Sequence, residues 1–323
     1  PYQAGIKQWV SLNTSVKSTT FDPTSQQFTV VTTNTTTGKE TTALFDYVIC
    51  CTGHFSSPNV PQFPGMATFP GRIMHAHDFR SAEEFTDKRI LVIGTSYSAE
   101  DIASQCYKYG VKSVHCSWRT APMGFHWPEN FTTVPLLTSI APGTKTCTFK
   151  DGSTAEIDAI ILCTGYQHSF PFVEPALRLK TTNRLWCDEL HEGVVMPNNH
   201  RMMYIGMQDQ WFTFNMFDAQ AWYCRDVILG KIALPNAATM KAEWEHWRAA
   251  EEAVAATDEA NIRYQAAYTQ RMQAYTDYPA FDIEGVVQCF MEWEHHKHEN
   301  IMYVGMCFIW GAGGCWGGCC WLT

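Results

Sequence analysis

Three small residues between a predicted strand and a predicted helix have the spacing of a phosphate-binding turn. Gly94, Ser96 and Ala99 fit the pattern G-x-G-x-x-G/A, with Ser at the second glycine position. Glycine permits the sharp turn, and the small residues let a pyrophosphate approach the backbone and let the helix pack closely. The helix N-terminus would then bind the phosphates. The pattern predicts dinucleotide binding.

The sequence around this turn predicts the strand–turn–helix–strand unit that such a pattern requires. The apolar run KRILVIG is typical of a buried parallel strand. Ser98 and Asp101 form a capping-box pattern, so we expect the helix to begin at Ser98 or at the next residue. We expect it to end just before Gly110, and VKSVHCSW predicts the following strand.

Arg119 and Thr120 follow this second strand, where NAD-binding units place an acidic residue for the ribose hydroxyl. A guanidinium group matches a phosphate in geometry and in charge. The segment SWRTAP therefore favours NADPH over NADH, and the alternative is that Arg119 is an ordinary surface residue.

A short internal repeat indicates a second unit of the same kind. FDYVICCTGH at residues 45–54 and IDAIILCTGY at residues 157–166 both predict a buried strand ending in Thr-Gly. Gly53 and Gly165 would let the backbone approach a ligand. We therefore predict an α/β fold of two dinucleotide-binding (Rossmann-like) domains, the second inserted in the first. No Gly-rich turn precedes Gly53, so we expect that turn of the first domain to lie upstream of the sequence given.

The composition is that of a globular protein, with 323 residues, 46% hydrophobic residues and a formal net charge of -9. This length allows two domains with substantial cores. The acidic balance argues against nucleic acid or an anionic membrane as a main partner. The 13 cysteines show no paired zinc-type spacing, and no secretory signal is evident. We expect reduced thiols, no metal site and a cytoplasmic location.

Both ends of the chain are unusual. The chain begins at Pro1, in a segment typical of a helix that leads into a strand, and residues 305–323 are rich in Gly, Cys and Trp. The final segment is apolar and about long enough for a transmembrane helix. Its dense glycines favour an altered terminus over a membrane anchor.

The sequence resembles the flavin-containing monooxygenases. FPGRIMHAHDF fits F-x-G-x-x-x-H-x-x-x-F/Y through Phe69, Gly71, His75 and Phe79, the identifying motif of these enzymes and of N-hydroxylating relatives. Phe79 stands where Baeyer–Villiger monooxygenases have Trp. Across residues 1–303 the similarity extends to the bacterial trimethylamine monooxygenases, through the segments ILCTGY, GTSYSAEDIASQCYKYG, RTAPMG and MQDQWFTFNMFDAQAWYCRDVILG.

This resemblance implies a flavoprotein that uses FAD and NADPH. In such enzymes NADPH reduces FAD, and the reduced flavin takes up O2 to give a C4a-hydroperoxyflavin. A small tertiary amine such as trimethylamine, or a related nitrogen or sulfur nucleophile, is then oxygenated. The protein mainly positions the reactants and excludes water. Members of the family tend to dimerise, so a homodimer is one expected assembly.

The resemblance also implies how the chain is divided. Residues 1–66 would be the remnant of the FAD-binding domain, and residues 67–166 the NADPH-binding domain. Residues 167–304 would form the C-terminal, helix-containing part of the FAD-binding domain, followed by the atypical tail at 305–323.

The resemblance assigns site residues one by one. The NADPH candidates are Gly94, Ser96, Tyr97, Ser98, Ala99, Arg119 and Thr120, the last two for the 2′-phosphate. Gln210 and Thr213 match positions that contact FAD, and Asp209 would lie beside the cofactors. Trp293 matches an active-site Trp, although on its own it could be a buried anchor.

Neighbouring aromatic and histidine residues have structural explanations. We expect Trp211, Phe212, Phe214 and Phe217 to form the core of a loop–helix junction rather than a substrate cage. We expect His295, His296 and His298 to lie on a solvated charged face, because their spacing suits no common metal geometry. We expect His75 to orient the link between domains.

Two other functions stay open. A flavin disulfide reductase also nests two dinucleotide domains, but it needs a redox cysteine pair, and Cys50 and Cys51 lie in a predicted strand. The absence of a first Gly-rich turn is also compatible with a truncated, non-catalytic NADP(H)-binding protein.

Overall fold

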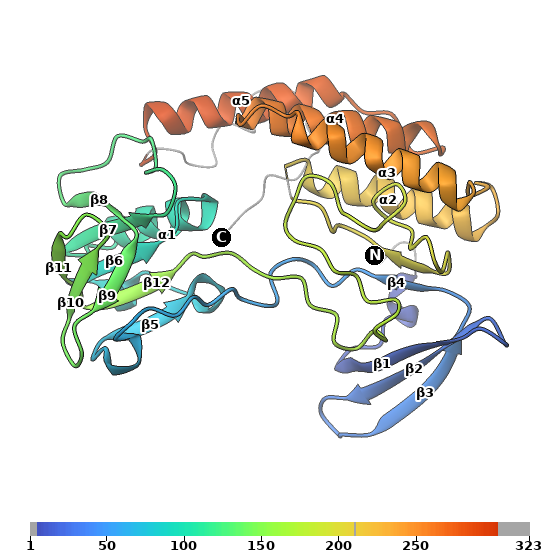
Figure 1. Ribbon diagram of the computed structural model, residues 1–323, viewed down its shortest axis with the longest axis horizontal. Coiled ribbons are helices and arrows are strands. Elements are labelled where there is room, and N and C mark those ends of the chain that lie inside the picture. The colour runs from blue at the N-terminus through green and yellow to red at the C-terminus, as the bar shows by residue number, and fades with distance from the viewer. Residues whose placement is uncertain (1–4, 210, 303–323) are drawn as a thin grey trace. The chain divides into compact units, whose positions relative to one another are not determined.

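The computed structural model describes residues 5–209 and 211–302 of the chain, which divide into two compact units (Figure 1). The first unit contains residues 5–54 and 168–283. The second contains residues 55–167 together with residues 284–302, which carry most of helix α5 (Ile283–Glu299). Residues 55–167 of the second unit thus interrupt the sequence of the first, and residues 284–302 follow it.

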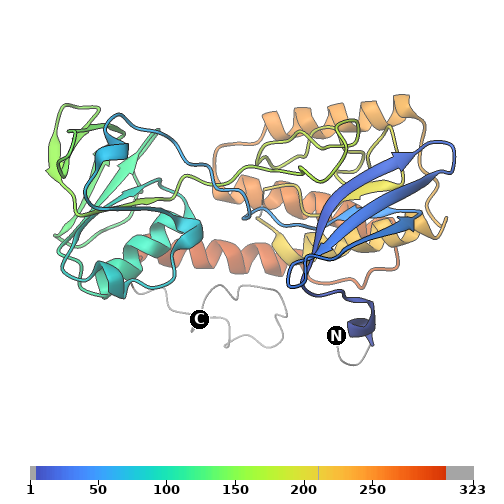
Figure 2. The ribbon, with the colours of Figure 1, turned by 90° about the horizontal axis from the view of Figure 1, so that it is seen from below.

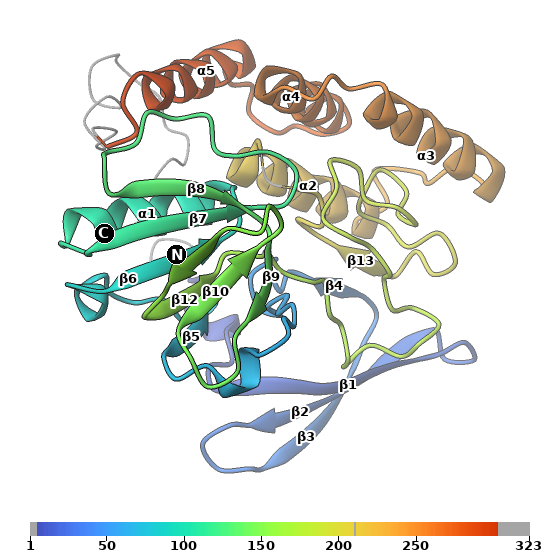
Figure 3. The same ribbon diagram turned by 60° about the vertical axis from the view of Figure 1, so that its left-hand side comes forward.

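The second unit is built around a five-stranded parallel sheet, whose strands and helix α1 are seen together in Figure 3. Its order is β5-β12-β6-β7-β8, and every neighbouring pair is parallel. The elements are β5 (Arg72–His75), β6 (Arg89–Ile93), α1 (Tyr97–Lys108), β7 (Ser113–Trp118), β8 (Phe131–Pro135) and β12 (Ala159–Leu162). Strand β12 is buried at all four positions, as expected for a Val/Ile-rich strand covered on both faces.

Helix α1 begins earlier than the sequence predicts. Tyr97 is its first residue, and the preceding Ser96 is the N-cap, whose carbonyl accepts from the N–H groups of Ala99 and Glu100. The predicted capping box at Ser98 is wrong, because the chain enters the helix directly from the turn that follows β6. The predicted end is confirmed: Gly110 follows the helix with φ +79°.

A three-stranded antiparallel sheet completes the second unit, with the order β11-β10-β9. Its strands are β9 (Leu137–Ile140), β10 (Thr146–Phe149) and β11 (Thr154–Glu156). Asp151 and Gly152, a sequence typical of a hairpin turn, join β10 and β11, which pair as antiparallel strands. Leu137 and Phe149 from this sheet pack with Leu91 and Ile160 of the parallel sheet in one apolar core.

The first unit contains a three-stranded meander, a two-stranded parallel sheet and three helices. The meander strands are β1 (Thr14–Asp22), β2 (Gln27–Asn34) and β3 (Glu40–Phe45), seen in blue in Figure 2. The parallel pair is β4 (Val48–Cys50) with β13 (Met202–Tyr204). The helices are α2 (Thr213–Ile228), α3 (Ala237–Glu252) and α4 (Asp258–Ala274).

The core of the first unit joins these elements through buried aromatic residues. Trp186, which is fully buried in the long irregular segment before β13, stacks on Trp247 of α3 with ring centroids 5.3 Å apart.

Short 3-10 helices lie in the loops of both units, at Ile6–Trp9, Met66–Thr68, Ala76–Asp78 and Glu83–Phe85. None of the helices in the described part of the chain is long and apolar enough to cross a membrane.

Helix α5 differs from the predicted division of the chain. The sequence analysis assigned it to the first domain with residues 167–304, whereas the structure groups it with the second unit. The reason is an ion pair and ring contacts between its last turns and the start of α1. The predicted tail at 305–323 lies outside the described residues.

Candidate functional site

The turn after β6 in the second unit can be formed only with glycine at position 94. Gly94 has φ +131°, and a Cβ atom there would lie 2.1 Å from the carbonyl oxygen of Cys163. Its N–H donates to the carbonyl of Ser117 at 3.0 Å, so the turn is bound to the ends of both neighbouring strands. Because this contact fixes the backbone, the N-terminus of α1 has a defined position at the carboxyl edge of the sheet.

The first residues of α1 are exposed to solvent on one side and packed against the apolar core on the other. Ala99 is fully buried in the core below the helix, whereas Ser96 and Ser98 are exposed. The Ser96 side chain makes no capping hydrogen bond. The first N–H groups of an α-helix have no intrahelical acceptor, and with the helix dipole they attract anions. A pyrophosphate therefore fits this turn, because the helix end offers both free N–H donors and a positive electrostatic potential.

Arg119 and Thr120 come directly after β7, at the same edge of the sheet as Gly94. Both are exposed, and within residues 5–209 and 211–302 Arg119 has no ion-pair partner. A guanidinium group that is not engaged by a carboxylate can bind a phosphate in a bidentate manner. The position after the second strand of such a unit is where the ribose end of a dinucleotide is recognised.

The two Thr-Gly turns adopt the same backbone conformation. Gly53 follows β4 with φ +72°, and Gly165 follows β12 with φ +76°. A Cβ atom at either position would meet no atom within 4 Å, so the glycines are required by their conformation rather than by crowding. Each turn lies at the carboxyl end of a parallel strand in its own unit.

His75 supports the second of these turns. Its Nδ1 accepts from the N–H of His77 at 3.0 Å, so Nε2 carries the proton and donates to the carbonyl of Gly165 at 3.0 Å. Burial lowers the pKa of His75, which favours this neutral form. Gly71 of the same motif has no room for a side chain, because a Cβ would lie 2.2 Å from the carbonyl oxygen of Asp158. The motif therefore attaches β5 to β12 and orients the Thr-Gly turn.

In the first unit, Asp209 and Thr213 lie on the loop that leads into α2. Asp209 accepts from Asn183 Nδ2 at 2.9 Å and from Trp211 Nε1 at 3.1 Å. Thr213 has φ +37°, a left-handed conformation that costs a β-branched residue about 1–3 kcal/mol and that occurs preferentially at ligand sites. Gln210 lies outside the described residues.

Three fully buried glutamines hold this loop, and the sequence analysis missed them. Gln265 Oε1 of α4 accepts from the backbone N–H groups of Trp211 and Phe212, each at 2.9 Å. Gln220 of α2 accepts from the N–H of Gly206 at 2.8 Å and donates to Gln208 at 2.9 Å. Glutamine on the apolar face of a predicted helix was the available signal, since a buried amide requires hydrogen-bond partners.

The aromatic residues near this loop divide between two roles. Phe212 is buried, in agreement with a junction core, whereas 57% of Phe214 is exposed. The rings of Phe214 and Phe217 lie 6.4 Å apart and contact each other edge to face. The prediction of a common core is therefore wrong for Phe214, which leaves its ring on the surface of α2.

Trp293 is not a buried anchor. It is 38% exposed on α5, and its ring centroid lies 5.8 Å from that of Tyr97 at the start of α1. His295 and His296 are also solvated and form ion-pair contacts with Glu299, as expected for a charged face. The next residue, Lys297, is only 3% exposed and was missed because its neighbours are polar.

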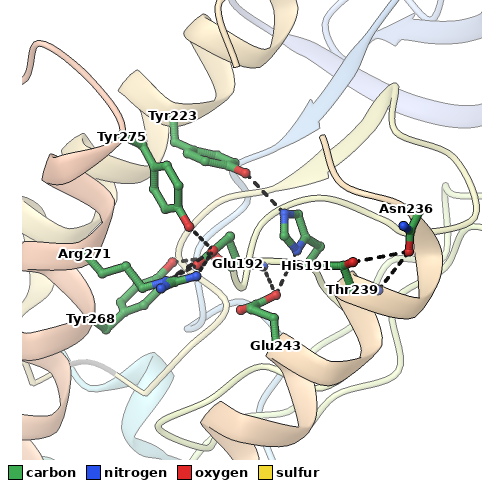
Figure 4. A network of polar contacts seen from close by, with 9 residues as sticks. All are labelled: His191, Glu192, Tyr223, Asn236, Thr239, Glu243, Tyr268, Arg271 and Tyr275. Atoms are coloured by element: carbon green, nitrogen blue, oxygen red, sulfur yellow. Dashed lines mark hydrogen bonds and ion pairs between the residues drawn. The ribbon is translucent and has the colours of Figure 1, made fainter. Parts of the chain in front are cut away.

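A second polar cluster in the first unit centres on His191 and Glu192 (Figure 4). These two residues and Glu243 have donor atoms within 4.8 Å of one another, a separation that could hold a metal ion. However, His191 is hydrogen-bonded to Glu243 at 2.8 Å and to Tyr223 at 3.3 Å, through both ring nitrogens. Arg271 engages both oxygens of Glu192. The geometry is that of a hydrogen-bond network that joins α2, α3 and α4 to the segment before β13.

The cysteines at the end of β4 do not have the properties of a redox pair. Burial raises the pKa of both thiols, to about 12 for Cys50. Reactive cysteines require a lowered pKa, because the thiolate is the nucleophile. This argues against the disulfide reductase alternative.

Comparisons with known proteins point to one family. The family model described as FMO-like, flavin-binding monooxygenase-like, matches residues 4–123 and 132–282. A trimethylamine monooxygenase from Methylocella silvestris is 51% identical over 300 residues, covering 93% of this chain and 66% of the relative. A trimethylamine monooxygenase from Roseovarius sp. strain 217 is 52% identical, with the same coverage. The chain therefore spans about two thirds of the length of these curated relatives.

Solved structures agree with this relationship. The crystal structure of Tmm from Pelagibacter sp. strain HTCC7211 matches with a TM-score of 0.88 and 45% identity, covering 92% of this chain and 66% of that one. S-allyl-L-cysteine S-oxygenase from Allium sativum matches with a TM-score of 0.78 at 22% identity, which indicates a common fold.

Proposed function

Because the chain belongs to the flavin-binding monooxygenase-like family, we propose that it acts in an FAD- and NADPH-dependent monooxygenase that converts trimethylamine, or a related small amine, to its N-oxide. FAD and NADPH are the cofactors of this family. The substrate rests on relatives named trimethylamine monooxygenase, which are 51% and 52% identical to this chain. The observation that carries the proposal is the turn at Gly94, with Arg119 at the same edge of a parallel sheet.

In this proposal the second unit binds NADPH. The N–H groups at the start of α1 would hold the pyrophosphate, and Arg119 with Thr120 would hold the 2′-phosphate. Tyr97 and Trp293, whose rings lie 5.8 Å apart, would lie next to the nucleotide. The second unit would then be the NADPH domain, inserted in the sequence of the FAD domain.

The first unit would contribute to FAD binding. Gly53 would allow the cofactor to approach the backbone after β4, and the loop with Asp209 and Thr213 would contact it. Bound FAD would supply the electron transfer and the activation of oxygen. The protein's own part is to orient the reactants and to exclude water, and the buried glutamines support that part by fixing the loop before α2.

The proposal is tested with the purified chain. FAD is added, the visible spectrum is recorded, and NADPH and then trimethylamine are added in air. We expect the flavin absorbance to bleach with NADPH and trimethylamine N-oxide to accumulate. Binding of NADPH without flavin binding or N-oxide would instead support the non-catalytic NADP(H)-binding alternative.

Arg119→Ala tests the assignment of the nucleotide. We expect its affinity for NADPH to fall roughly tenfold to a hundredfold, the loss expected for a charged hydrogen-bonded phosphate contact, with no change for NADH. Lys112→Ala is a matched control, because Lys112 is also an exposed cation but directly precedes β7, at the opposite end of that strand from Arg119. Equal affinities of Arg119→Ala and Lys112→Ala for NADPH would contradict the assignment.

A further inference from the structure

Lys297 places a buried ammonium group beside the N-terminal turn of α1. The residue is 3% exposed, and its Nζ lies 2.8 Å from Glu100 Oε2 and 3.0 Å from Glu294 Oε1. Glu100 belongs to the first turn of α1, whereas Lys297 and Glu294 are on α5. The three side chains therefore connect the two helices through charge.

Aromatic rings enclose the same ammonium group. Its nitrogen lies 4.4 Å from the ring centroid of Tyr97, 4.3 Å from that of Trp293 and 5.5 Å from that of Phe125. Tyr97 also donates its hydroxyl to Glu294 Oε1 at 3.1 Å. Cation–π contacts of this kind hold a ring in place as well as the cation. Lys297 thus contacts α5, the loop after β7 and α1, the helix that begins directly after the turn at Gly94.

The charges around this ammonium group are not balanced. On α1 it is near Glu100, Asp101 and the hydroxyl of Tyr97, and on α5 it is near Glu294. Burial raises the pKa of Glu100 to about 7, while the charge of Lys297 opposes that rise. Among the described residues, the ionisable neighbours that these contacts give the ammonium group are all acidic, so without it their charge near the N-terminus of α1 would be uncompensated.

We propose that Lys297 is a positioning residue for the nicotinamide dinucleotide, which offsets the carboxylates at the start of α1 and fixes Tyr97 and Trp293 beside the phosphate-binding turn. This inference rests on the proposed function, in which that turn binds NADP(H). The physical reason is that the positive end of a helix attracts phosphate only if nearby carboxylates do not cancel its field.

Titration calorimetry of the full chain with NADP⁺ tests the proposal. We expect Lys297→Met to weaken binding roughly tenfold, the size of a favourable charge effect at a helix terminus. Loss of Lys297 raises the pKa of Glu100 further, so the double variant Lys297→Met/Glu100→Gln is compared with Lys297→Met at a pH where titration shows Glu100 of the single variant to be ionised. There the second substitution removes one negative charge, and we expect it to recover most of the lost affinity. Lys150→Met, an exposed lysine in the turn between β10 and β11, is the matched control and should bind like the wild type.

A pH profile separates this role from a purely structural one. Above pH 7, Glu100 loses its proton and adds a negative charge near the phosphates. The wild type should therefore bind NADP⁺ more weakly at pH 8 than Glu100→Gln does, and the two should converge near pH 6. The titration of the ligand's own phosphate is common to both proteins and drops out of their ratio.

The outcomes distinguish the inference from the proposed function. A wild-type chain that does not bind NADP⁺ overturns the proposed function. A wild type that binds, with unchanged affinity in Lys297→Met or no recovery in the double variant, overturns the role of Lys297. If Lys297→Met does not fold, the pH profile of Glu100→Gln decides, and a profile identical to the wild type overturns the inference.

Discussion

The two Thr-Gly turns have nearly the same sequence and the same backbone conformation, but the molecule supports them differently. In the second unit, Gly165 follows a central strand of a five-stranded sheet, and the backbone N–H of Asn59 and the ring of His75 hold its carbonyl. In the first unit, Gly53 follows a strand with one partner, β13, among the described residues. The buried amide side chains of that unit hold a different segment, the loop before α2.

This difference shows what a repeated motif determines. The motif specifies a local turn, because glycine alone adopts the left-handed conformation easily. It does not specify the support, which depends on distant parts of the chain. In the second unit the turn at Gly94 depends on backbone contacts, and in the first unit the loop before α2 depends on amide side chains, so these two regions should respond to different substitutions.

Gly94→Ala should have the largest effect. The added Cβ would overlap the carbonyl oxygen of Cys163, and φ +131° is unfavourable for alanine, so we expect a loss of about 3 kcal/mol or more in the free energy of unfolding. Chemical denaturation measures it. Gly124→Ala is the control, because a Cβ there meets nothing within 4 Å, and it should change stability by less than about 0.5 kcal/mol. Equal effects would mean that backbone contact does not govern the second unit.

Gln265→Leu should have the next largest effect, and in the first unit. It leaves the N–H groups of Trp211 and Phe212 without their acceptor, at a cost of about 2–4 kcal/mol. Amide hydrogen exchange should accelerate at residues 211–212. Gln270→Leu changes an exposed glutamine on the same helix and should leave exchange unaltered. Unchanged exchange in Gln265→Leu would show that the loop has another support.

Acid should destabilise both units through histidines that burial keeps neutral, and more strongly in the first. Burial lowers the pKa of His168 to about 4, and it lowers that of His75 as well. The unfolded chain therefore binds protons first, so this stability is complete above pH 6.5 and is lost as the pH falls toward the folded-state pKa. Stability measured from pH 7 to pH 4 should fall less steeply in His168→Asn than in the wild type. An identical slope would contradict the assignment.

The smallest effect concerns the helix caps. Asn236 caps α3 by accepting from the N–H of Thr239 at 3.0 Å, whereas the side chain of Ser96 makes no capping bond to α1. Asn236→Ala should therefore cost about 1 kcal/mol of unfolding free energy, and Ser96→Ala only a few tenths. Thermal denaturation compares the two. An equal cost would mean that the start of α1 is stabilised like that of an ordinary helix rather than left open to a ligand.

Much of the second unit could be predicted from sequence, because its signals are local. The apolar strands, the turn at Gly94 and the stop at Gly110 each depend on a few adjacent residues. The start of α1 was placed too late because Ser98 looked like a cap, while the chain geometry after Gly94 determined the helix start.

The supporting side chains could not be predicted in the same way. Gln265 and Lys297 act on residues 54 and 197 positions away, on Trp211 and Glu100. The position of Gln265 on a helix face is a local signal of burial, but nothing near either residue in the sequence identifies its partner. Their burial follows from tertiary packing, which the local pattern does not contain.

The inserted second unit also has a consequence for how the chain folds. Val48 of β4 pairs with Met202 of β13, so this contact closes a long loop that contains the whole segment 55–167. Closing such a loop from an unfolded chain is entropically costly and slow. Within the second unit, however, Pro58 bridges to Tyr166, which brings the two ends of the insertion together. A second unit that folds first would shorten the effective loop, and the order of folding would then run from the inserted segment to its host.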